Sequence, residues 1–254
     1  MTIRTTLSFS MRAATLGLCL AAIAAATPGE APNTLSDKER ASGWRLLWDG
    51  SSTRGWRAAK GRAFPASGWE IQDGVLSVVE TGGAESRAGG DIVSEASFAA
   101  FELAFEFRPT PGANSGVKYY VDTGLNTGEG SAIGLEFQLL DDARHPDAKA
   151  GRDGNRTLGS LYDLIPAAAA KLTRPIGEWN AARIVSDGRH VEHWLNGAKV
   201  LEYERGSEAF RKLVAASKYK VWPAFGERPR GPILLQDHGN RVSFRSLKIR
   251  ELEP

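Results

Sequence analysis

The sequence predicts an all-β fold, a sandwich of two antiparallel sheets with one or two short helices. Apolar and polar residues alternate in segment after segment, which is the periodicity of a strand with one buried face. Gly-rich and Asn-Gly turns separate these segments at the regular spacing of a sandwich. The 254 residues include 42% apolar side chains and 28 glycines. This is enough for one substantial core and many tight turns, so we expect a single domain.

The N-terminal residues have the pattern of a cleaved export signal. Arg4 and Arg12 precede a small apolar run, residues 13–25, and an Ala-x-Ala motif follows at its end. We expect residues 1–26 to be a signal peptide, cleaved after Ala26, and the mature protein to be periplasmic or secreted. A lipoprotein signal ending at Cys19 is disfavoured, because Leu18 stands where such signals have a small residue.

Charge and cysteine content exclude several classes of protein. The 32 Lys and Arg residues and 30 Asp and Glu residues nearly cancel to a net charge of +2. A nucleic-acid-binding protein or a polybasic membrane anchor needs a concentrated basic field, so neither partner is expected. No segment after the signal approaches the about 20 apolar residues of a membrane span. Cys19 is the only cysteine, so the mature chain would have no disulfide.

The strand segments follow one another after a short N-terminal helix. Residues 27–42 are expected to form a linker and this helix, because Ser36 and Glu39 have the spacing of a capping box. The sandwich domain then covers residues 43–254. Its expected strand segments are 43–50, 68–78, 100–108, 114–121, 134–140, 179–186 with 191–195, and 232–236 with 242–249.

Two stretches interrupt the strand pattern. Residues 141–160 are polar and Gly-rich, and a loop of that length within a compact domain is more often functional than incidental. It is the candidate site loop. Residues 207–216 place Phe210, Leu213 and Val214 at helical spacing behind a serine, which predicts a short helix that packs on the sandwich.

Pleat parity brings candidate site residues together. Alternate side chains of a strand share a face, so in the segment 134–141 Glu136 and Gln138 project opposite to the apolar positions 135, 137 and 139. The same argument puts Gln236 and His238 on one face and Asp237 on the other.

The alternation of side chains in the segment 114–121 predicts where a lysine and a tyrosine point. It places Lys118 and Tyr120 on one face with Gly116, opposite Val117 and Tyr119. Lys118 is then either a cation of a cleft or a solvated strand lysine.

Several blocks occur together and in a characteristic order: Asn-Ser-Gly-Val-Lys at 114–118, Glu136-x-Gln138, Gly-Glu-Trp-Asn at 177–180, Trp-Leu-Asn-Gly at 194–197, and Leu-Gln-Asp-His-Gly at 235–239 with Phe-Arg-Ser at 244–246. From about Gly43 to the C-terminus, the chain resembles the 3-keto-disaccharide hydrolase domain family. The resemblance implies a concanavalin A-like jelly roll, which agrees with the strand pattern. It also implies an enzyme that cleaves glycosides already oxidised at C3.

The implied chemistry suits the residue types. A ketone at C3 acidifies the C2 proton, so a base removes it and the enolate expels the C1 substituent. The reaction then either ends at this elimination or continues with the addition of water, which completes a net hydrolysis. Such a site needs a base, an acid for the departing oxygen, and a donor or cation for the enolate oxygen. The proton-transfer candidates are Glu136 and His238, with the division between acid and base left open. The candidate substrate-binding residues are Asn114, Lys118, Gln138, Tyr162, Lys218 and Gln236.

The site loop begins with a cluster of possible metal ligands. Asp141, Asp142, His145 and Asp147 either cap and solvate the loop, the favoured interpretation, or bind a divalent cation, with Asp141 and His145 as the candidate ligands. No cofactor is required by the sequence, although a divalent cation would stabilise an enolate.

Other residues are candidates for contact with a sugar. From the same loop Arg152, Asn155 and Arg156 are candidates to reach the substrate. Trp222 and Phe225 are candidates to stack on a sugar face, whereas Trp69 is expected in the core.

Two alternatives remain. A retaining glycosidase needs two carboxyl groups about 5 to 5.5 Å apart, but Asp141 falls on the face opposite to Glu136. A lectin-like module would hold carbohydrate without cleaving it and would tolerate replacement of Glu136 and His238. In the enzyme reading, a separate sugar 3-dehydrogenase must make the ketone, because the chain has no dinucleotide-binding Gly-rich turn between a strand and a helix.

Overall fold

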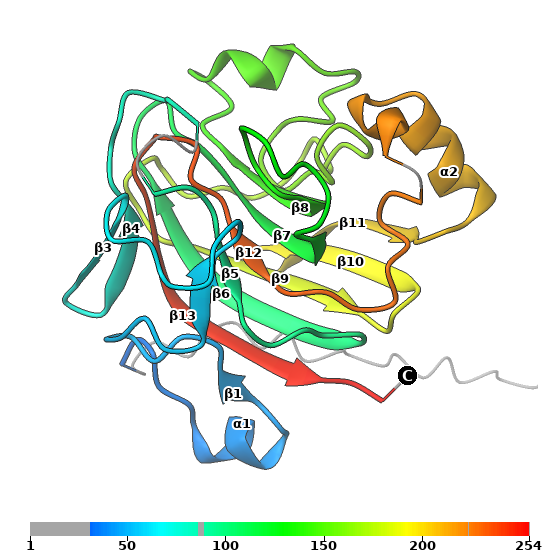
Figure 1. Cartoon of the computed structure of the whole chain (residues 1–254). Coiled ribbons are helices and arrows are strands. Elements are labelled where there is room, and N and C mark those ends of the chain that lie inside the picture. The colour runs from blue at the N-terminus through cyan, green and yellow to red at the C-terminus, as the bar shows by residue number, and fades with distance from the viewer. Residues whose placement is uncertain (1–30, 86–88, 223, 254) are drawn as a thin grey trace, which may run out of the picture.

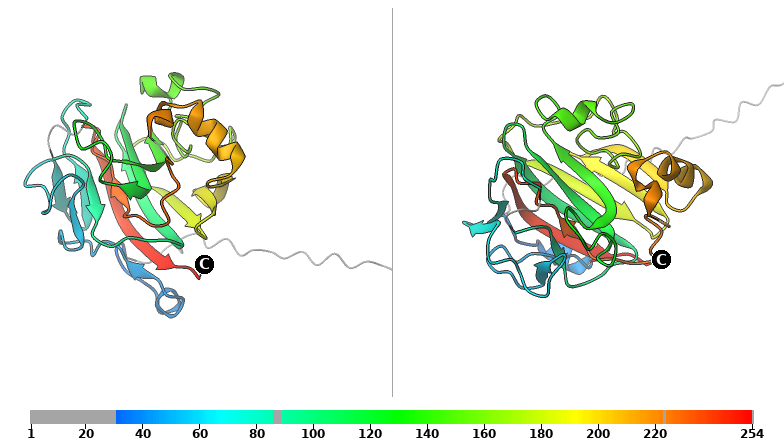
Figure 2. Two further views of the ribbon diagram at one scale, coloured as in Figure 1. Left: turned by 45° about the vertical axis from the view of Figure 1, so that its right-hand side comes forward. Right: turned by 45° about the horizontal axis from the view of Figure 1, so that its top comes forward.

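The computed structural model describes residues 31–85, 89–222 and 224–253. Two antiparallel sheets are packed as layers, with α2 at one side and the loop after β8 above them (Figure 1). Two further views show the same layers from other directions (Figure 2). The predicted jelly-roll sandwich is confirmed. The predicted signal peptide lies outside the described residues.

The larger sheet has the strand order β11-β10-β9-β6-β13-β4-β3, with β1 paired to β13. The smaller sheet has the order β2-β5-β12-β7-β8. The strands of the larger sheet are β1 (Arg45–Leu46), β3 (Trp69–Gln72), β4 (Val75–Val78), β6 (Phe101–Pro109), β9 (Asn180–Ser186), β10 (His190–Leu195), β11 (Ala198–Glu204) and β13 (Val242–Glu251). Those of the smaller sheet are β2 (Trp56–Ala58), β5 (Ile92–Ser94), β7 (Asn114–Asp122), β8 (Ile133–Leu140) and β12 (Leu234–Leu235).

The core lies between the two sheets and is built by strand alternation. In β6 the residues Phe101, Leu103, Phe105 and Phe107 are all buried. The Phe105 ring meets the Phe137 ring of β8 edge to face, with 5.8 Å between centroids. Such pairs add to the free energy of area burial. The two sheets are therefore joined by aromatic packing directly beneath β8.

Three strands are absent from the prediction. β2 and β5 are three residues long, too short to display a period. β11 contains two adjacent buried residues, Val200 and Leu201, because the register of its pairing with β10 shifts by a bulge. A bulge interrupts alternation, so the sequence of β11 does not alternate like a regular strand.

Both predicted helices are present. α1 (Asp37–Ala41) begins at the Ser36–Glu39 capping box. α2 (Glu208–Ala215) is capped by Ser207 and buries Phe210 against the sandwich. Two 3₁₀ turns, η1 (Pro146–Lys149) and η2 (Lys218–Val221), lie in loops. Within the described residues, no helix has the length and apolar character to cross a membrane.

The prediction that Tyr120 shares a face with Lys118 is wrong. The register between β7 and β8 shifts after Tyr119, and Tyr120 has a left-handed backbone with a φ of 51°. This bulge turns Tyr120 toward the core, where its hydroxyl bonds to Ser186 Oγ at 2.7 Å. The parity argument assumes an unbroken pleat, and it fails at the residue where the pleat is broken.

A fully buried imidazole links the two sheets within the core. His193 lies on β10, its Nε2 is 2.8 Å from the Tyr119 hydroxyl, and its Nδ1 is 3.0 Å from the Gly159 carbonyl oxygen. A carbonyl accepts, so Nδ1 carries the hydrogen and Nε2 accepts from Tyr119. Burial lowers the pKa of His193 to about 4. The neutral ring thus ties the larger sheet to the site loop.

This burial predicts a pH-dependent stability. The pKa of His193 is about 4 in the folded protein, whereas a solvated imidazole has a pKa of about 6.5. Below pH 6.5 the unfolded chain therefore binds the proton more strongly. Stability from this group is therefore lost as the pH falls, by about 2 kcal/mol between pH 7 and pH 5. Urea denaturation at both values should show a smaller loss in His193→Gln than in the wild type.

His190→Gln is the matched control, because burial does not determine its pKa. The hydrogen bond that His190 Nδ1 donates to the Glu204 carboxylate raises the pKa of His190. His190 therefore does not contribute to the loss of stability on acidification, and His190→Gln should keep that loss in full. An equal loss in His193→Gln and the wild type would contradict the account.

Candidate active site

One pocket, of about 340 Å³, is lined by all eight residues predicted as catalytic or substrate-binding. It lies on the face of the smaller sheet that is turned away from the core. β8 contributes Glu136 and Gln138, and β7 contributes Asn114 and Lys118. The remaining four are Gln236 and His238 after β12, Tyr162 from the loop after β8, and Lys218 from η2.

The pleat of β8 separates core from pocket as predicted. Leu135, Phe137 and Leu139 are fully buried in the core, whereas Glu136 and Gln138 line the pocket. Lys118 lies directly opposite Glu136 in the β7–β8 register. The Gln236 backbone N–H donates to the Gly116 carbonyl at 2.9 Å, which continues the β12–β7 pairing toward His238.

Glu136 is a buried carboxylate with few protein partners. Its residue is only 4% exposed, and Oε2 is 3.7 Å from Lys118 Nζ, an ion pair too long for a hydrogen bond. No group in the described part of the chain donates a hydrogen bond to this carboxylate. Burial raises the pKa of Glu136, and the positive charges of Lys118 and Lys218 oppose this effect only in part. The carboxylate is therefore a stronger base than an exposed one.

Gly116 makes room for this carboxylate. A Cβ built at Gly116 would lie 2.1 Å from Glu136 Oε1 and 2.8 Å from Glu136 Cδ. No real Cβ tolerates such a contact, so only glycine permits this position of Glu136.

Three buried side-chain nitrogen or oxygen atoms in the described residues have no hydrogen-bond partner, and all three belong to pocket residues. They are Gln138 Oε1, Gln236 Oε1 and His238 Nδ1. The Gln138 amide is held by its own Nε2, which donates to Asn114 Oδ1 at 3.2 Å. A buried polar atom without a partner costs about 1–3 kcal/mol. Hydroxyl groups of a bound ligand would satisfy the two amide oxygens.

The pocket wall formed by the loop after β8 and by η2 carries an aromatic ring and a cation. The Tyr162 hydroxyl donates to Asp147 Oδ2 at 2.7 Å, and Lys218 Nζ lies 4.2 Å from the centre of the Tyr162 ring. Lys218 is exposed at the pocket mouth, but protein surrounds its ammonium on several sides, and this desolvation lowers its pKa. The arrangement places a second positive charge near Glu136.

The site loop is held by its own ion pairs. Arg156 bonds to Asp147 and Asp163, each at 2.8 Å, and so supports Tyr162 from behind. Neither Arg152 nor Asn155 lines the pocket. Asn155 instead accepts a hydrogen bond from the Arg152 backbone N–H at 2.9 Å. Arg156 does not line the pocket either, so none of the three loop residues expected to reach the substrate belongs to the pocket wall.

The candidate metal ligands are used within the loop. Asp141 accepts from the Gly112 N–H at 2.8 Å and pairs with Arg144 at 3.0 Å, and it does not line the pocket. His145 Nδ1 accepts from the Asp147 N–H, and its ring lies 5.9 Å from that of His238. These contacts fit the capping role that the sequence favoured.

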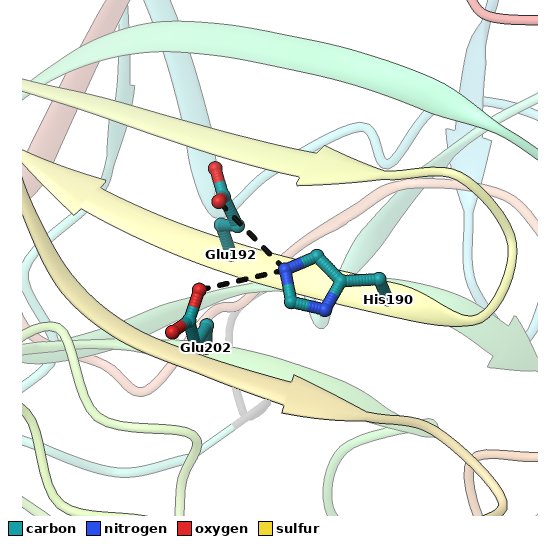
Figure 3. Close-up of side chains that lie close together, drawn as sticks. All are labelled: His190, Glu192 and Glu202. Atoms are coloured by element: carbon teal, nitrogen blue, oxygen red, sulfur yellow. Dashed lines mark ion pairs between the residues drawn. The ribbon is translucent and has the colours of Figure 1, made fainter. Parts of the chain in front are cut away.

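A second group of potential metal ligands lies on β10 and β11 (Figure 3). His190, Glu192 and Glu202 converge there, as the sole such group found among the residues described. Lys199 Nζ is 3.0 Å from Glu192 and 2.5 Å from Glu202, so one ammonium group already pairs with both carboxylates. The group is a network of ion pairs outside the pocket.

Sequence reasoning missed six side chains of the pocket wall and correctly named one aromatic residue. The pocket is also lined by Glu85, Asn126, Ser131, Ala132, Ile133 and Tyr219, and no periodic pattern marks them. Trp222 lines the pocket as expected, and Trp69 lies in the core. Phe225 is buried and stacks on Tyr219 with 3.9 Å between ring centres, so it is not a sugar platform.

Comparison with known proteins gives consistent matches over this chain. Residues 43–250 match the family of the 3-keto-alpha-glucoside-1,2-lyase-like domain. A 3-keto-disaccharide hydrolase of Bacteroides thetaiotaomicron is 36% identical over 233 residues, which cover 84% of this chain and 80% of that protein. Two crystal structures from Parabacteroides distasonis are also similar. The first has a TM-score of 0.76 and is 30% identical, with 88% of this chain and 100% of the other chain covered. The second has a TM-score of 0.60 and is 27% identical, with 82% of this chain and 99% of the other chain covered.

The close contact between Gly116 and Glu136 predicts that a methyl group added at position 116 destabilises the fold. Gly116→Ala should destabilise the fold by about 1–3 kcal/mol, because the Cβ and the Glu136 carboxylate cannot both keep their places. Gly128→Ala is the control, since a Cβ there meets nothing within 4 Å and the backbone is not left-handed. Urea denaturation measures both, and equal stability of the two variants would show that Gly116 is not needed.

Proposed function

Because the chain belongs to the 3-keto-alpha-glucoside-1,2-lyase-like domain family, we propose that it is an enzyme that cleaves the glycosidic bond of 3-keto-glycosides, including 3-keto-disaccharides. The observation that carries this proposal is the meeting of Glu136 and His238 in one pocket with two unpartnered amide oxygens. A sugar ring offers several hydroxyl donors for those oxygens, and its reacting carbons would lie between the acidic and the basic group.

The reaction would begin with removal of the proton on C2, which the C3 ketone acidifies. The electron pair of the C2–H bond forms an enolate, and the enolate then expels the oxygen at C1. A proton from the enzyme goes to the departing oxygen, which leaves as an alcohol. The other product is an enone, and addition of water at C1 with return of a proton to C2 completes a net hydrolysis.

Glu136 is the proposed base. Burial raises its pKa, and a base is most effective when its pKa approaches the working pH. No protein hydrogen bond within the described residues occupies its carboxylate oxygens. The ammonium groups of Lys118 and Lys218 both act on it electrostatically and would attract the negative charge that moves onto the enolate oxygen.

His238 is the proposed acid. It is only half buried, beyond the end of β12, whereas Glu136 is almost fully buried. The departing group must leave through the pocket mouth, so an acid near that side is suitably placed for its oxygen. The Nδ1 atom has no protein partner among the described residues, which leaves it available to the substrate.

Glu85 gives a specific reason to consider a conventional glycosidase as the second candidate. It is a further carboxylate in the pocket wall, at an exposed position. Direct displacement requires two carboxyl groups across the scissile bond. Glycosides without the C3 ketone distinguish the two functions, because only direct displacement cleaves them at a comparable rate.

The proposed substrate must be produced by another enzyme. A glycoside must first be oxidised at C3, and we assign this step to a separate sugar 3-dehydrogenase. The predicted signal peptide supports the proposal that the cleavage takes place outside the cytoplasm, in the periplasm or the medium.

Replacement of either proton-transfer residue should abolish most activity. Glu136→Gln and His238→Asn should each lower kcat/KM for a 3-keto-glucoside by about 10²–10⁴-fold. Chromogenic aglycone release measures this. Glu202→Gln and His190→Asn, outside the pocket, should retain normal rates. Full activity of Glu136→Gln would remove this residue from the mechanism, and no release by the wild type would favour a binding module.

The unpartnered amide oxygen of Gln138 predicts a binding defect. Gln138→Leu has a similar volume but cannot accept a hydroxyl hydrogen bond, so KM should rise by about 10-fold or more. Asn126→Leu changes another pocket amide, whose Nδ2 already donates to the Ser131 carbonyl at 2.8 Å. Steady-state kinetics should show the larger rise in KM for Gln138→Leu, and an unchanged KM would argue against the proposed contact.

A further inference from the structure

We propose that Asp91 and Ser131 are positioning residues that hold the Lys118 ammonium away from the Glu136 carboxylate, and so keep Glu136 free to accept a proton. The catalytic meaning of this arrangement rests on the proposed function. The arrangement itself can be tested without any substrate. Asp91 lies just before β5 and Ser131 just before β8, and neither was singled out by sequence reasoning.

Lys118 donates its hydrogen bonds to the segment just before β8 and not to Glu136. Its ammonium donates to Ser131 Oγ in a short contact and to the Ala132 carbonyl at 3.1 Å. Glu136 Oε2 is farther away, at 3.7 Å. All these groups are buried, since Lys118 is 5% exposed and Glu136 is 4% exposed. The lysine therefore lies beside Glu136 but is bound by other groups.

Asp91 is the counter-charge that makes this placement possible. Its Oδ2 accepts a hydrogen bond from the Ser131 hydroxyl, and the oxygen of the same hydroxyl accepts the hydrogen bond from Lys118 Nζ. Asp91 is 5% exposed, and a buried carboxylate needs a positive neighbour. The chain Asp91–Ser131–Lys118 thus satisfies one buried pair of charges and leaves Glu136 as an additional negative charge.

Asp91 also holds the pocket walls through the backbone. Its Oδ2 accepts from the Ala132 N–H at 3.1 Å, and its Oδ1 accepts from the Asp237 N–H at 3.0 Å. Asp237 precedes His238 and accepts from the N–H groups of Gly90 and Gly239, each at 2.9 Å. Replacement of Asp91 therefore disturbs both charge and structure, whereas replacement of Ser131 spares the two backbone bonds.

The charges around Glu136 determine the sign of the effect. Lys118 from β7 and Lys218 from η2 favour its ionised form, and Asp91 and Glu85 from the loop before β5 oppose it. Tyr162, Tyr219 and His238 complete the titratable groups of the pocket. Loss of the Asp91 charge removes repulsion, and loss of the Ser131 hydroxyl frees Lys118 to turn toward Glu136. Both changes favour ionised Glu136.

The test is a direct titration of the Glu136 carboxyl group. NMR of the full-length protein labelled with ¹³C at the glutamate carboxyl carbon follows the signal with pH, and Glu136→Gln identifies it. We expect this carboxyl to titrate at lower pH in Asp91→Asn and in Ser131→Ala than in the wild type. Ser77→Ala is the matched control, because it removes a buried Ser77–Ser243 hydrogen bond of 2.9 Å between β4 and β13, and it should leave the titration unchanged.

The outcomes separate this inference from the proposed function. A midpoint of Glu136 that is unchanged or raised in Ser131→Ala overturns the inference, even if Asp91→Asn fails to fold. If the variants titrate as expected and the wild type cleaves 3-keto-glycosides, the acidic limb of kcat/KM should shift to lower pH in both variants. If they titrate as expected but the wild type cleaves no such substrate, the positioning role stands and the proposed function fails.

Discussion

The pleat of β8 is the constraint on which the site depends. Within five residues, alternation sends Leu135, Phe137 and Leu139 into the core and Glu136 and Gln138 into the pocket. The apolar side chains fix the strand against the larger sheet, so the direction in which the polar side chains project is set by the packing of the core. A one-residue slip would exchange the two sets, so the same packing that stabilises the sandwich also determines where its polar groups meet.

Burial gives these groups their chemistry. Glu136 lies in a poorly solvated pocket, and its partner Lys118 is bound more closely to Ser131 and Ala132 than to the carboxylate. The neutral His193 supports β8 from the core side of the strand. It donates to the Gly159 carbonyl, and the Gly159 N–H in turn donates to the Gln138 carbonyl at 2.8 Å. The core and the pocket are thus connected through β8 and the loop beside it.

Sequence reasoning succeeded where a periodic pattern carries the information. The alternation in β8 was sufficient to place Glu136 and Gln138 together, and the capping motifs at Ser36 and Ser207 located both helices. It failed at Tyr120, because a bulge has no periodic signature. It also missed Asp91, which lies in a loop 45 positions before Glu136 and is brought next to Ser131 only through the tertiary pairing of β5, β12, β7 and β8.

The central claim is that the chemistry starts at C2 of an oxidised sugar and not at C1. A 3-keto-glucoside that carries deuterium at C2 tests it most directly, by comparison of its cleavage rate with that of the protiated compound. The account predicts slower cleavage of the deuterated substrate and loss of the label to solvent in the enone-derived product. Equal rates for the two substrates, together with full retention of deuterium at C2, would contradict it.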